Sequence, residues 1–328
     1  MKPEELKQEL NQGMTRPVYL LYGDEPYLIQ QYCRQITDLI ITEDSFRDFN
    51  YYRTDKIEQE KIEQFLQTPP VFAEKKLLLF KDTGVFKNPK AADKDFLQTI
   101  LADVPDYACI VFAEQTIDKK QKKLLALAET VECNQMTEAQ LKTWITILVQ
   151  RQKKKITVKT IEHLISCCGS AMFHLEHEIN KLCSCTEEDV ITTEQIDKIV
   201  VKSVENRIFD LSNAVLNQQN KTAFSILTDL KILRESPIKI IGFLSKSFCD
   251  IYKIKQCPNP TPQGTGLHPY VVKLHTATAR KLSAQTLTSL ISLAAECDTA
   301  LKSSAVTDWT VLETCIAACL DVSKGASL

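Results

Sequence analysis

Short apolar runs alternate with amphipathic stretches over residues 17–134 of the chain. The runs are rich in leucine, aromatic and β-branched residues, and the stretches between them repeat their apolar positions at helical spacing. Alternation of this kind predicts βαβ units arranged in a mainly parallel sheet. The predicted strands are residues 18–22, 49–52, 77–80, 109–112 and 131–133.

The first predicted helix follows the first strand after a very short turn. It begins near Glu25, with Asp24 as the expected N-cap, and Glu25 favours the positive end of the helix. Its apolar positions fall on one face, so we expect it to pack on the sheet. These positions are Leu28, Ile29, Tyr32, Cys33, Ile36, Leu39 and Ile40.

The strand pattern stops after Met136, and the rest of the chain reads as helical. Thr137 and Gln140 have the spacing of a capping box, and Thr192 with Gln195 marks a later helix start. Ser236-Pro237 is a further start signal, with Ser236 as the expected cap, whereas the proline- and glycine-rich residues 257–269 are expected to form a loop. We therefore predict an α/β domain over residues 1–136, with a nucleotide-binding type of parallel sheet, followed by two all-α domains over residues 137–204 and 205–328.

Composition fits a folded protein of two or three domains. The 328 residues are 44% hydrophobic and 25% charged, with a net charge of −2, which gives no global attraction for nucleic acid or anionic membrane. The first residues have no apolar core of a signal peptide and no stretch approaches a membrane span, so we expect a cytoplasmic protein. The twelve scattered cysteines are expected to be reduced core residues without structural disulfides.

Two clusters of basic residues could contact nucleic acid. Neither contains the interleaved aromatic residues that stack on bases, so a solvated helix face is the favoured interpretation of both. The first is Lys119, Lys120, Lys122 and Lys123, and the second is Arg151, Lys153, Lys154, Lys155 and Lys159.

The turn after the first strand stands where a phosphate loop is found in nucleotide-binding domains. A phosphate loop needs glycines, a Lys and a Ser or Thr at fixed spacing. Here Gly23 is followed by Asp24, Glu25 and Pro26: two carboxylates repel phosphate, and the proline has no N–H to donate. We predict a degenerate nucleotide loop at Gly23, Asp24 and Glu25, and expect no cofactor and no catalytic activity of the chain itself.

Histidines and cysteines crowd into residues 163–185, which raises a zinc site as an alternative. The gaps between neighbouring cysteines do not let two thiolates share one tetrahedral ion, so residues of a small helical bundle are the favoured interpretation. The residues are His163, Cys167, Cys168, His174, His177, Cys183 and Cys185. No nucleophile elbow and no recognisable catalytic histidine motif is present.

Two prolines precede the predicted strand at residues 77–80. Because Pro69 and Pro70 keep this segment out of helix and strand, Val71 and Phe72 could stand on a projecting tip, flanked by Pro70 and Ala73. The alternative is that Phe72 covers the sheet edge. Burying both side chains in a partner is worth roughly 3–5 kcal/mol. Micromolar binding needs about 8 kcal/mol, so such an anchor requires neighbouring contacts.

The order of several segments resembles the delta subunit of the bacterial DNA polymerase III clamp loader over essentially the whole chain. The segments are Pro17-Val18-Tyr19-Leu20-Leu21-Tyr22-Gly23-Asp24-Glu25-Pro26-Tyr27-Leu28, Pro70-Val71-Phe72-Ala73-Glu74-Lys75-Lys76-Leu77, Leu175-Glu176-His177-Glu178-Ile179-Asn180-Lys181-Leu182, Ile208-Phe209-Asp210-Leu211, His268-Pro269-Tyr270-Val271-Val272 and Asp298-Thr299-Ala300-Leu301-Lys302-Ser303.

The resemblance implies an AAA+-like domain without a working nucleotide site, a small helical lid and a helical collar that assembles with the gamma or tau and delta prime subunits. It also implies binding to the sliding clamp, the beta subunit, and opening of that ring for loading onto primer-template DNA within the polymerase holoenzyme. Val71 and Phe72 stand where the family carries its clamp-binding apolar pair, and many members have Leu in place of Val71.

Two other classes of function stay open at the level of sequence. One is an active AAA+ ATPase subunit of a loader, which saturable binding of ATP to the isolated chain would favour. The other is a zinc-dependent binding module, which stoichiometric metal would favour.

Overall fold

The computed structural model describes residues 1–42, 44–200, 204–267, 269–303 and 308–324. Its contacts divide the chain into two compact units, Met1–Met136 and Thr137–Leu328. The three-domain division stays a prediction, and its second boundary lies beside residues 201–203, outside the described ones.

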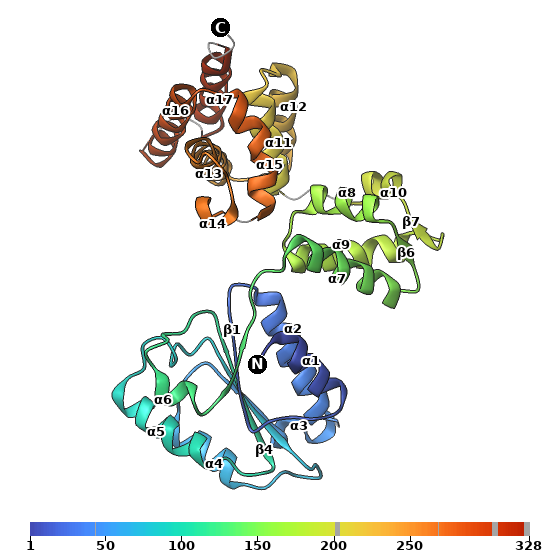
Figure 1. Ribbon diagram of the computed structural model, residues 1–328, viewed down its shortest axis with the longest axis vertical. Helices are drawn as coiled ribbons and strands as arrows, with labels where there is room; N and C mark the ends of the chain where they lie inside the picture. Colours follow the sequence, from blue (N-terminus) through green and yellow to red (C-terminus); the bar gives the residue numbers. More distant parts are fainter. Residues whose placement is uncertain (43, 201–203, 268, 304–307, 325–328) are drawn as a thin grey trace. The chain divides into compact units, whose positions relative to one another are not determined.

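The first unit is built on a parallel five-stranded sheet of order β2-β3-β4-β1-β5. This arrangement confirms the predicted parallel α/β fold (Figure 1). The strands are β1 Val18–Tyr22, β2 Tyr51–Thr54, β3 Lys76–Lys81, β4 Ala108–Glu114 and β5 Glu129–Glu132.

Helices cover both faces of this sheet because its central strands are apolar on both sides. Leu20, Leu78 and Phe112 lie in one buried cluster with residues of α4 and α5, and Phe80 stacks on Phe112 with ring centroids 4.6 Å apart. Helix α2 packs against β1, β3 and β4 on the other face. The helical elements are α1 Pro3–Asn11, α2 Pro26–Ile40, η1 Asp44–Phe46, α3 Arg47–Asn50, α4 Gln59–Gln67, α5 Ala91–Ala102 and α6 Lys122–Leu125.

Two details of the predicted N-terminal fold are wrong. Residues 49 and 50 belong to the single turn α3 instead of the second strand, so Phe49 lies outside the sheet. The N-cap of α2 is Glu25, whose carboxylate accepts a hydrogen bond from Tyr27 N, and Asp24 instead accepts one from the backbone N–H of Gln135. The Asp24 carboxylate is directed to the backbone that follows β5, which leaves Glu25 as the residue that caps the first turn of α2.

In the part of the second unit that the structure describes, the regular elements are helices apart from one short ladder. Its first part contains α7 Glu138–Arg151, α8 Val158–Cys168, α9 Met172–Cys185 and α10 Thr193–Ile199, and the predicted capping boxes of Thr137 and Thr192 are both present. The prediction of helix alone is wrong at β6 Lys155–Ile156 and β7 Val190–Ile191, which pair in parallel. Two residues are too short for a periodic signal, so only tertiary pairing defines them.

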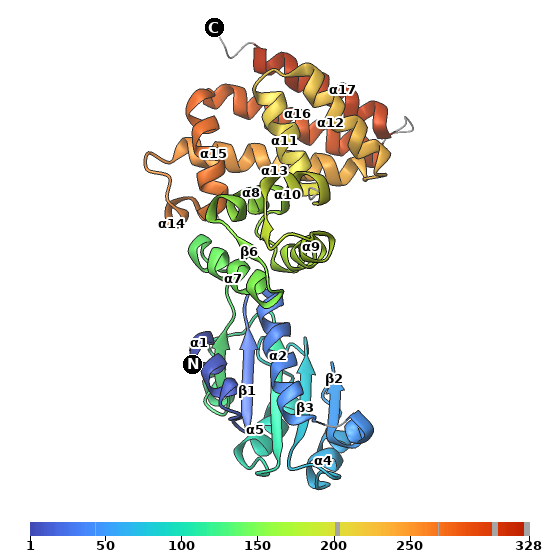
Figure 2. The ribbon, with the colours of Figure 1, turned by 90° about the vertical axis from the view of Figure 1, so that its right-hand side faces the viewer.

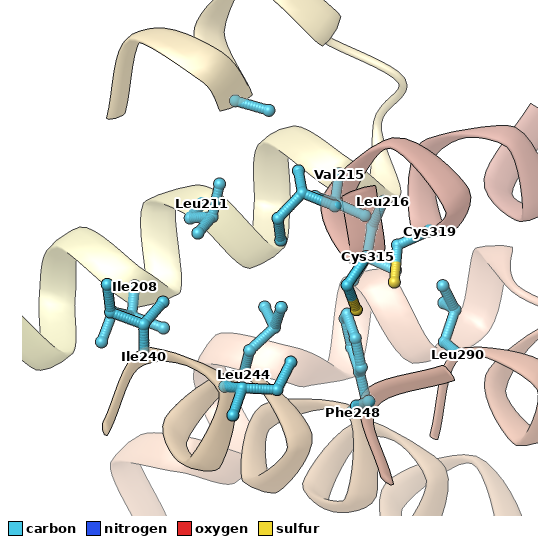
Figure 3. Packing of buried hydrophobic residues seen from close by; sticks show 14 of the residues in the cluster. Ile208, Leu211, Val215, Leu216, Ile240, Leu244, Phe248, Leu290, Cys315 and Cys319 are labelled. Carbon is cyan, nitrogen blue, oxygen red and sulfur yellow. The ribbon is translucent and has the colours of Figure 1, made fainter. Parts of the chain in front are cut away.

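The remaining helices, apart from the one-turn helix at Pro262–Thr265, pack around one apolar core. Figure 3 shows Leu211 and Val215 of α11 above Leu244 and Phe248 of α13, with Cys315 and Cys319 of α17 beside them. Nine of the twelve cysteines are buried, which agrees with their predicted use as small core residues. The helices are α11 Val204–Leu216, α12 Asn220–Ile232, α13 Pro237–Gln256, α14 Pro262–Thr265, α15 Pro269–Lys281, α16 Ala284–Ser303 and α17 Asp308–Lys324.

Two predictions for this region need correction, and one lies outside the described residues. The predicted loop at residues 257–269 contains the one-turn helix α14, capped by Thr261. Helix α13 begins at Pro237 as predicted, but Ser236 makes no side-chain cap hydrogen bond. His268 is outside the described part of the chain. Among the described residues, no helix has the length and apolar content that a membrane crossing requires.

Candidate functional site

The turn between β1 and α2 is closed by its own residues. Gly23, Asp24 and Glu25 are the only residues between the two elements, which is shorter than any phosphate loop. The backbone N–H of Glu25 donates to Cys133 O at 3.0 Å. A Cβ on Gly23 would lie 2.2 Å from the same carbonyl oxygen, so close approach to the end of β5 requires glycine there.

The positive N-terminal end of α2 is occupied by a carboxylate of the chain. Glu25 is buried, and burial raises its pKa while the hydrogen bond from Tyr27 N lowers it. On β4, Glu114 is also buried and accepts hydrogen bonds from the backbone N–H groups of Thr83 and Gly84; burial raises its pKa. Both carboxylates at this carboxyl edge therefore bond to the chain's own N–H groups, and a phosphate at the start of α2 would have to displace Glu25.

The candidate tip, residues 68–75, lies at the opposite, amino edge of the sheet. It connects the end of α4 to the start of β3, and its neighbour is the turn α3 that leads into β2. Figure 2 shows α4 at the end of the sheet where strands β2 and β3 begin. In open parallel sheets, catalytic and cofactor sites gather at the carboxyl edge, so a site on the amino edge favours recognition of a partner.

Phe72 is the most solvent-exposed of the large hydrophobic side chains described, at 82%. Its φ of +49° lies in the left-handed region, which a non-glycine residue adopts only at a cost. The ring touches the ring of Phe46, with centroids 4.8 Å apart. The alternative in which Phe72 covers the sheet edge is therefore wrong, since the ring lies in solvent.

Val71 is half-buried, and its backbone is clamped by one buried side chain. The amide of Asn50 donates from Nδ2 to Val71 O and accepts at Oδ1 from Val71 N, both at 2.8 Å. Asn50 is only 3% exposed. This pair of bonds imitates strand pairing and fixes the residue that precedes Phe72.

Lys76 holds the other side of the tip. Its buried Nζ donates to Phe65 O at 2.6 Å and to Thr68 O at 2.7 Å, and lies 4.0 Å from the centre of the Phe65 ring. Burial lowers the pKa of this lysine. A cation at the carbonyl end of α4 also complements the helix dipole. The tip is thus anchored at both ends, while Pro69 and Pro70 stiffen the segment between.

Phe49, on the adjacent turn α3, is 60% exposed and extends the apolar surface. With Tyr52, Phe65 and Val71 it lines a hollow of about 290 Å³. We call Val71, Phe72, Phe46 and Phe49, together with this hollow, the apolar tip surface. Sequence reasoning missed Phe49 because it was placed in a strand, and missed Asn50 and Lys76 because nothing in a linear pattern indicates side chains that bond to a distant backbone. The one available signal was a Lys directly joined to the apolar run 77–80.

The structure also places the other residues that the sequence analysis named as candidates. Pro70 and Ala73 flank the tip and are half-buried, and the four lysines of the first basic cluster are exposed. In the second cluster, Lys154 is used internally: its Nζ donates to Thr186 O and Glu188 O. Of the His and Cys residues at 163–185, the structure brings together His163 and Cys167, and adds Asp197.

Fold and site together define a nucleotide-binding type of sheet whose phosphate-loop position is closed and whose opposite edge displays an apolar surface. Comparison with known proteins shows which family has this combination of features. The family model of the DNA polymerase III delta subunit matches residues 19–136, and the model of that subunit's C-terminal domain matches residues 205–319, together more than half of the chain.

Individual relatives agree with the family models. The DNA polymerase III subunit delta of Bacillus subtilis is 26% identical over 318 residues, covering 90% of each chain, and that of Escherichia coli is 22% identical over 269 residues, covering 79% of this chain and 77% of its own. The solved structure of the Bacillus subtilis DNA clamp loader delta protein has the same fold, with a TM-score of 0.71 at 24% identity over 97% of this chain and 99% of its own. The chain belongs to the family of DNA polymerase III delta subunits.

Proposed function

We propose that this delta-family subunit binds the ring-shaped sliding clamp through the apolar tip surface and holds the ring open for loading onto primed DNA. The observation that carries the proposal is Phe72: an 82% exposed ring on a backbone held at positive φ. Displaying an aromatic side chain to water and straining its backbone both cost free energy, which natural sequences retain mainly where the residue has a function.

Preorganisation of the tip supports the same proposal. Asn50 and Lys76 fix the backbone on either side of Phe72 before any partner arrives. A partner therefore does not have to order the loop, and more of the gross contact energy becomes affinity. An exposed aromatic anchor beside a hollow is also the arrangement of an interface hot spot.

The magnitudes require more than the Val71–Phe72 pair. Moving a closed–open equilibrium of the clamp from 1:99 to 99:1 needs about 5.5 kcal/mol of preference for the open form. The pair supplies at most roughly 3–5 kcal/mol on burial. Phe49 and the hollow beside it offer the additional contact area, so we include Phe49 in the proposed clamp site.

We also propose that the chain neither binds nor hydrolyses ATP, and that ATP used by partner subunits controls when the tip is available. The closed turn at Gly23, Asp24 and Glu25 supports this. A polar hollow of about 500 Å³ lined by Arg53, Thr54, Asp55, Lys81 and Asp82 lies at the carboxyl ends of β2 and β3, and strand β4 separates these strands from β1. Titration of the isolated chain with a fluorescent ATP analogue tests the rival ATPase, since saturable binding would favour it.

Assembly with the gamma or tau and delta prime subunits is proposed to use the C-terminal helices. Ile232, Leu233 and Ile238, around the turn between α12 and α13, are 74%, 47% and 40% exposed. Primer-template DNA is a proposed partner of the assembled loader, which would act in the cytoplasm. Ile232→Glu should weaken co-purification with the other subunits and leave clamp binding by the isolated chain unchanged.

Calorimetric titration of the full chain with purified clamp tests the central proposal. We expect low-micromolar binding by the wild type and none by the double variant Val71→Ala with Phe72→Ala. Val158→Ala, at a 63% exposed position in the second unit, is the matched control and should bind normally. Co-purification of the double variant with the other loader subunits should be intact; normal clamp binding by it would refute the assignment.

A further inference from the structure

Three side chains with metal-ligand atoms converge on the surface of the second unit. They are His163 and Cys167 of α8 and Asp197 of α10, and their ligand atoms all lie within 4.8 Å of one another. His163 Nε2 is 2.7 Å from Asp197 Oδ1 and 4.0 Å from Cys167 Sγ. This cluster has no part in the proposed clamp site.

Helices α8 and α10 determine the positions of the Cα atoms that carry these side chains. Positions 163 and 167 are four residues apart on α8, so they lie one above the other on the same helix face. The same i, i+4 spacing lets two helical residues share one metal ion in metalloproteases. Helix α10 starts at the Thr192 capping box and packs against α8, which brings Asp197 to that face.

The geometry does not fit a nucleophile–base–carboxylate relay. In such a relay the histidine uses one ring nitrogen for the nucleophile and the other for the carboxylate. Here the Cys167 sulfur and the Asp197 carboxylate both approach Nε2. Three donors that face one point instead suit a common ion. Helix spacing places the Cys167 sulfur beside His163, and the approach of Asp197 from α10 adds the third possible ligand.

We propose that His163, Cys167 and Asp197 bind one Zn²⁺ ion, with water as the fourth ligand. Imidazole nitrogen, thiolate and carboxylate oxygen are the ligands that zinc takes in proteins, at roughly 2.0–2.3 Å. Tetrahedral bonding at those lengths places the donor atoms roughly 3.3–3.6 Å apart. Relative to the present distances of 2.7 Å and 4.0 Å, this arrangement requires Asp197 Oδ1 to move away from His163 Nε2 and Cys167 Sγ to move toward it.

Zinc binding replaces the thiol proton of Cys167 by the metal ion. Zn²⁺ takes the sulfur lone pair of Cys167 as the thiol proton leaves to water, and the neutral His163 ring gives its Nε2 lone pair while Nδ1 carries the proton. Asp197 contributes one carboxylate oxygen, so the bound site carries no net charge. The ion has access from solvent, because the side chains of His163 and Asp197 are 34% and 63% exposed while Cys167 is buried beneath them.

The ion would brace the end of α8 where α11 docks. Asn206 of α11 donates from Nδ2 to Ser166 O at 3.2 Å and to Cys167 O at 2.6 Å. A zinc ligand at Cys167 therefore sits on the same peptide that Asn206 binds. Bound zinc joins α8 to α10 directly and stiffens the attachment of α11.

The test uses the full chain, stripped with a chelator and titrated with ZnCl₂ by calorimetry and with Co²⁺ by visible absorption. We expect one ion per chain, a dissociation constant below about 1 μM, and a thiolate-to-cobalt charge-transfer band. Asp197→Asn, at an exposed side chain, and His163→Gln, at a half-buried one, should each weaken binding at least tenfold, and Cys167→Ala should abolish the charge-transfer band.

Matched controls are Cys185→Ser and His177→Gln, an exposed cysteine and an exposed histidine on the neighbouring helix α9. Both should bind zinc as the wild type does, and zinc should raise the unfolding temperature of the wild type more than that of Asp197→Asn. Non-saturable uptake, or equal loss of binding in the controls and the ligand variants, would overturn the site.

Discussion

Replacing Phe72 by glycine should separate binding from folding. Relief of the positive φ stabilises the fold by about 1–2 kcal/mol. Greater freedom of the unfolded chain costs about 0.4–1 kcal/mol, and loss of the contact with Phe46 costs about 0.5–1.5 kcal/mol. These effects nearly cancel, so we expect the free energy of unfolding to change by less than about 1 kcal/mol.

Clamp affinity should respond very differently. Burying a whole phenylalanine side chain is worth about 1.5–3 kcal/mol, and 82% of this residue is available to a partner. Loss of the ring should therefore weaken clamp binding roughly 10- to 100-fold. Phe72→Ala, which keeps the strained backbone, should lose as much affinity and be slightly less stable than Phe72→Gly.

Urea unfolding and calorimetric titration with the clamp measure the two quantities on the same preparations. Phe80→Ala is the core control: this ring is fully buried against Phe112, and its loss should cost about 3–5 kcal/mol. A comparable loss of stability in Phe72→Gly would mean that the ring is a structural residue. Unchanged clamp affinity in both Phe72 variants would remove it from the binding site.

Three further substitutions test other parts of the structure. Asn50→Ala removes both bonds to the Val71 backbone, so unfolding free energy should fall by about 1–3 kcal/mol and clamp affinity should fall with it; full affinity would show that the clamp tolerates a disordered tip. Gly23→Ala places a Cβ against Cys133 O and should destabilise the first unit without conferring ATP binding, as measured by urea unfolding and ATP-analogue titration; wild-type stability would contradict the close packing at this turn. His275 is buried against Phe209, and burial lowers its pKa from 6.5 to about 4. As the pH falls, the His275 ring therefore takes up its proton at a higher pH in the unfolded chain than in the folded one. The free energy of unfolding falls as the pH drops from 6.5 to 4, by about 2–3 kcal/mol at pH 4.5. His275→Leu should lack that loss when urea midpoints at pH 7 and 4.5 are compared, and an identical pH dependence in both proteins would contradict it.

Much of the fold follows from local pattern. Central strands such as β1 and β4 are apolar on both faces, so they read clearly as buried strands, and the capping boxes at Thr137 and Thr192 mark helix starts through neighbouring residues alone. The closed turn after β1 could also be predicted, because a phosphate loop depends on residue types at fixed spacing. Position 72 was indicated as a candidate tip by the two prolines before it.

Features that depend on contacts between residues far apart in the sequence could not be predicted in this way. Phe49 was placed in a strand because an aromatic residue suits both a strand and an exposed turn, and β6 and β7 exist only through their pairing with each other. Asp197 lies 34 residues from His163, so the zinc prediction, based on gaps between cysteines, did not include it.

The sequence by itself determined the parallel sheet, the capping boxes at Thr137 and Thr192 and the missing phosphate-loop motif, because each depends on residue types within a few positions of one another. Only the tertiary structure decided that Phe72 stays in water, that Asn50 and Lys76 hold the tip around it, and that His163, Cys167 and Asp197 meet. Burial and side-chain hydrogen bonds join positions far apart in the chain, and those distances exist only after the backbone has folded.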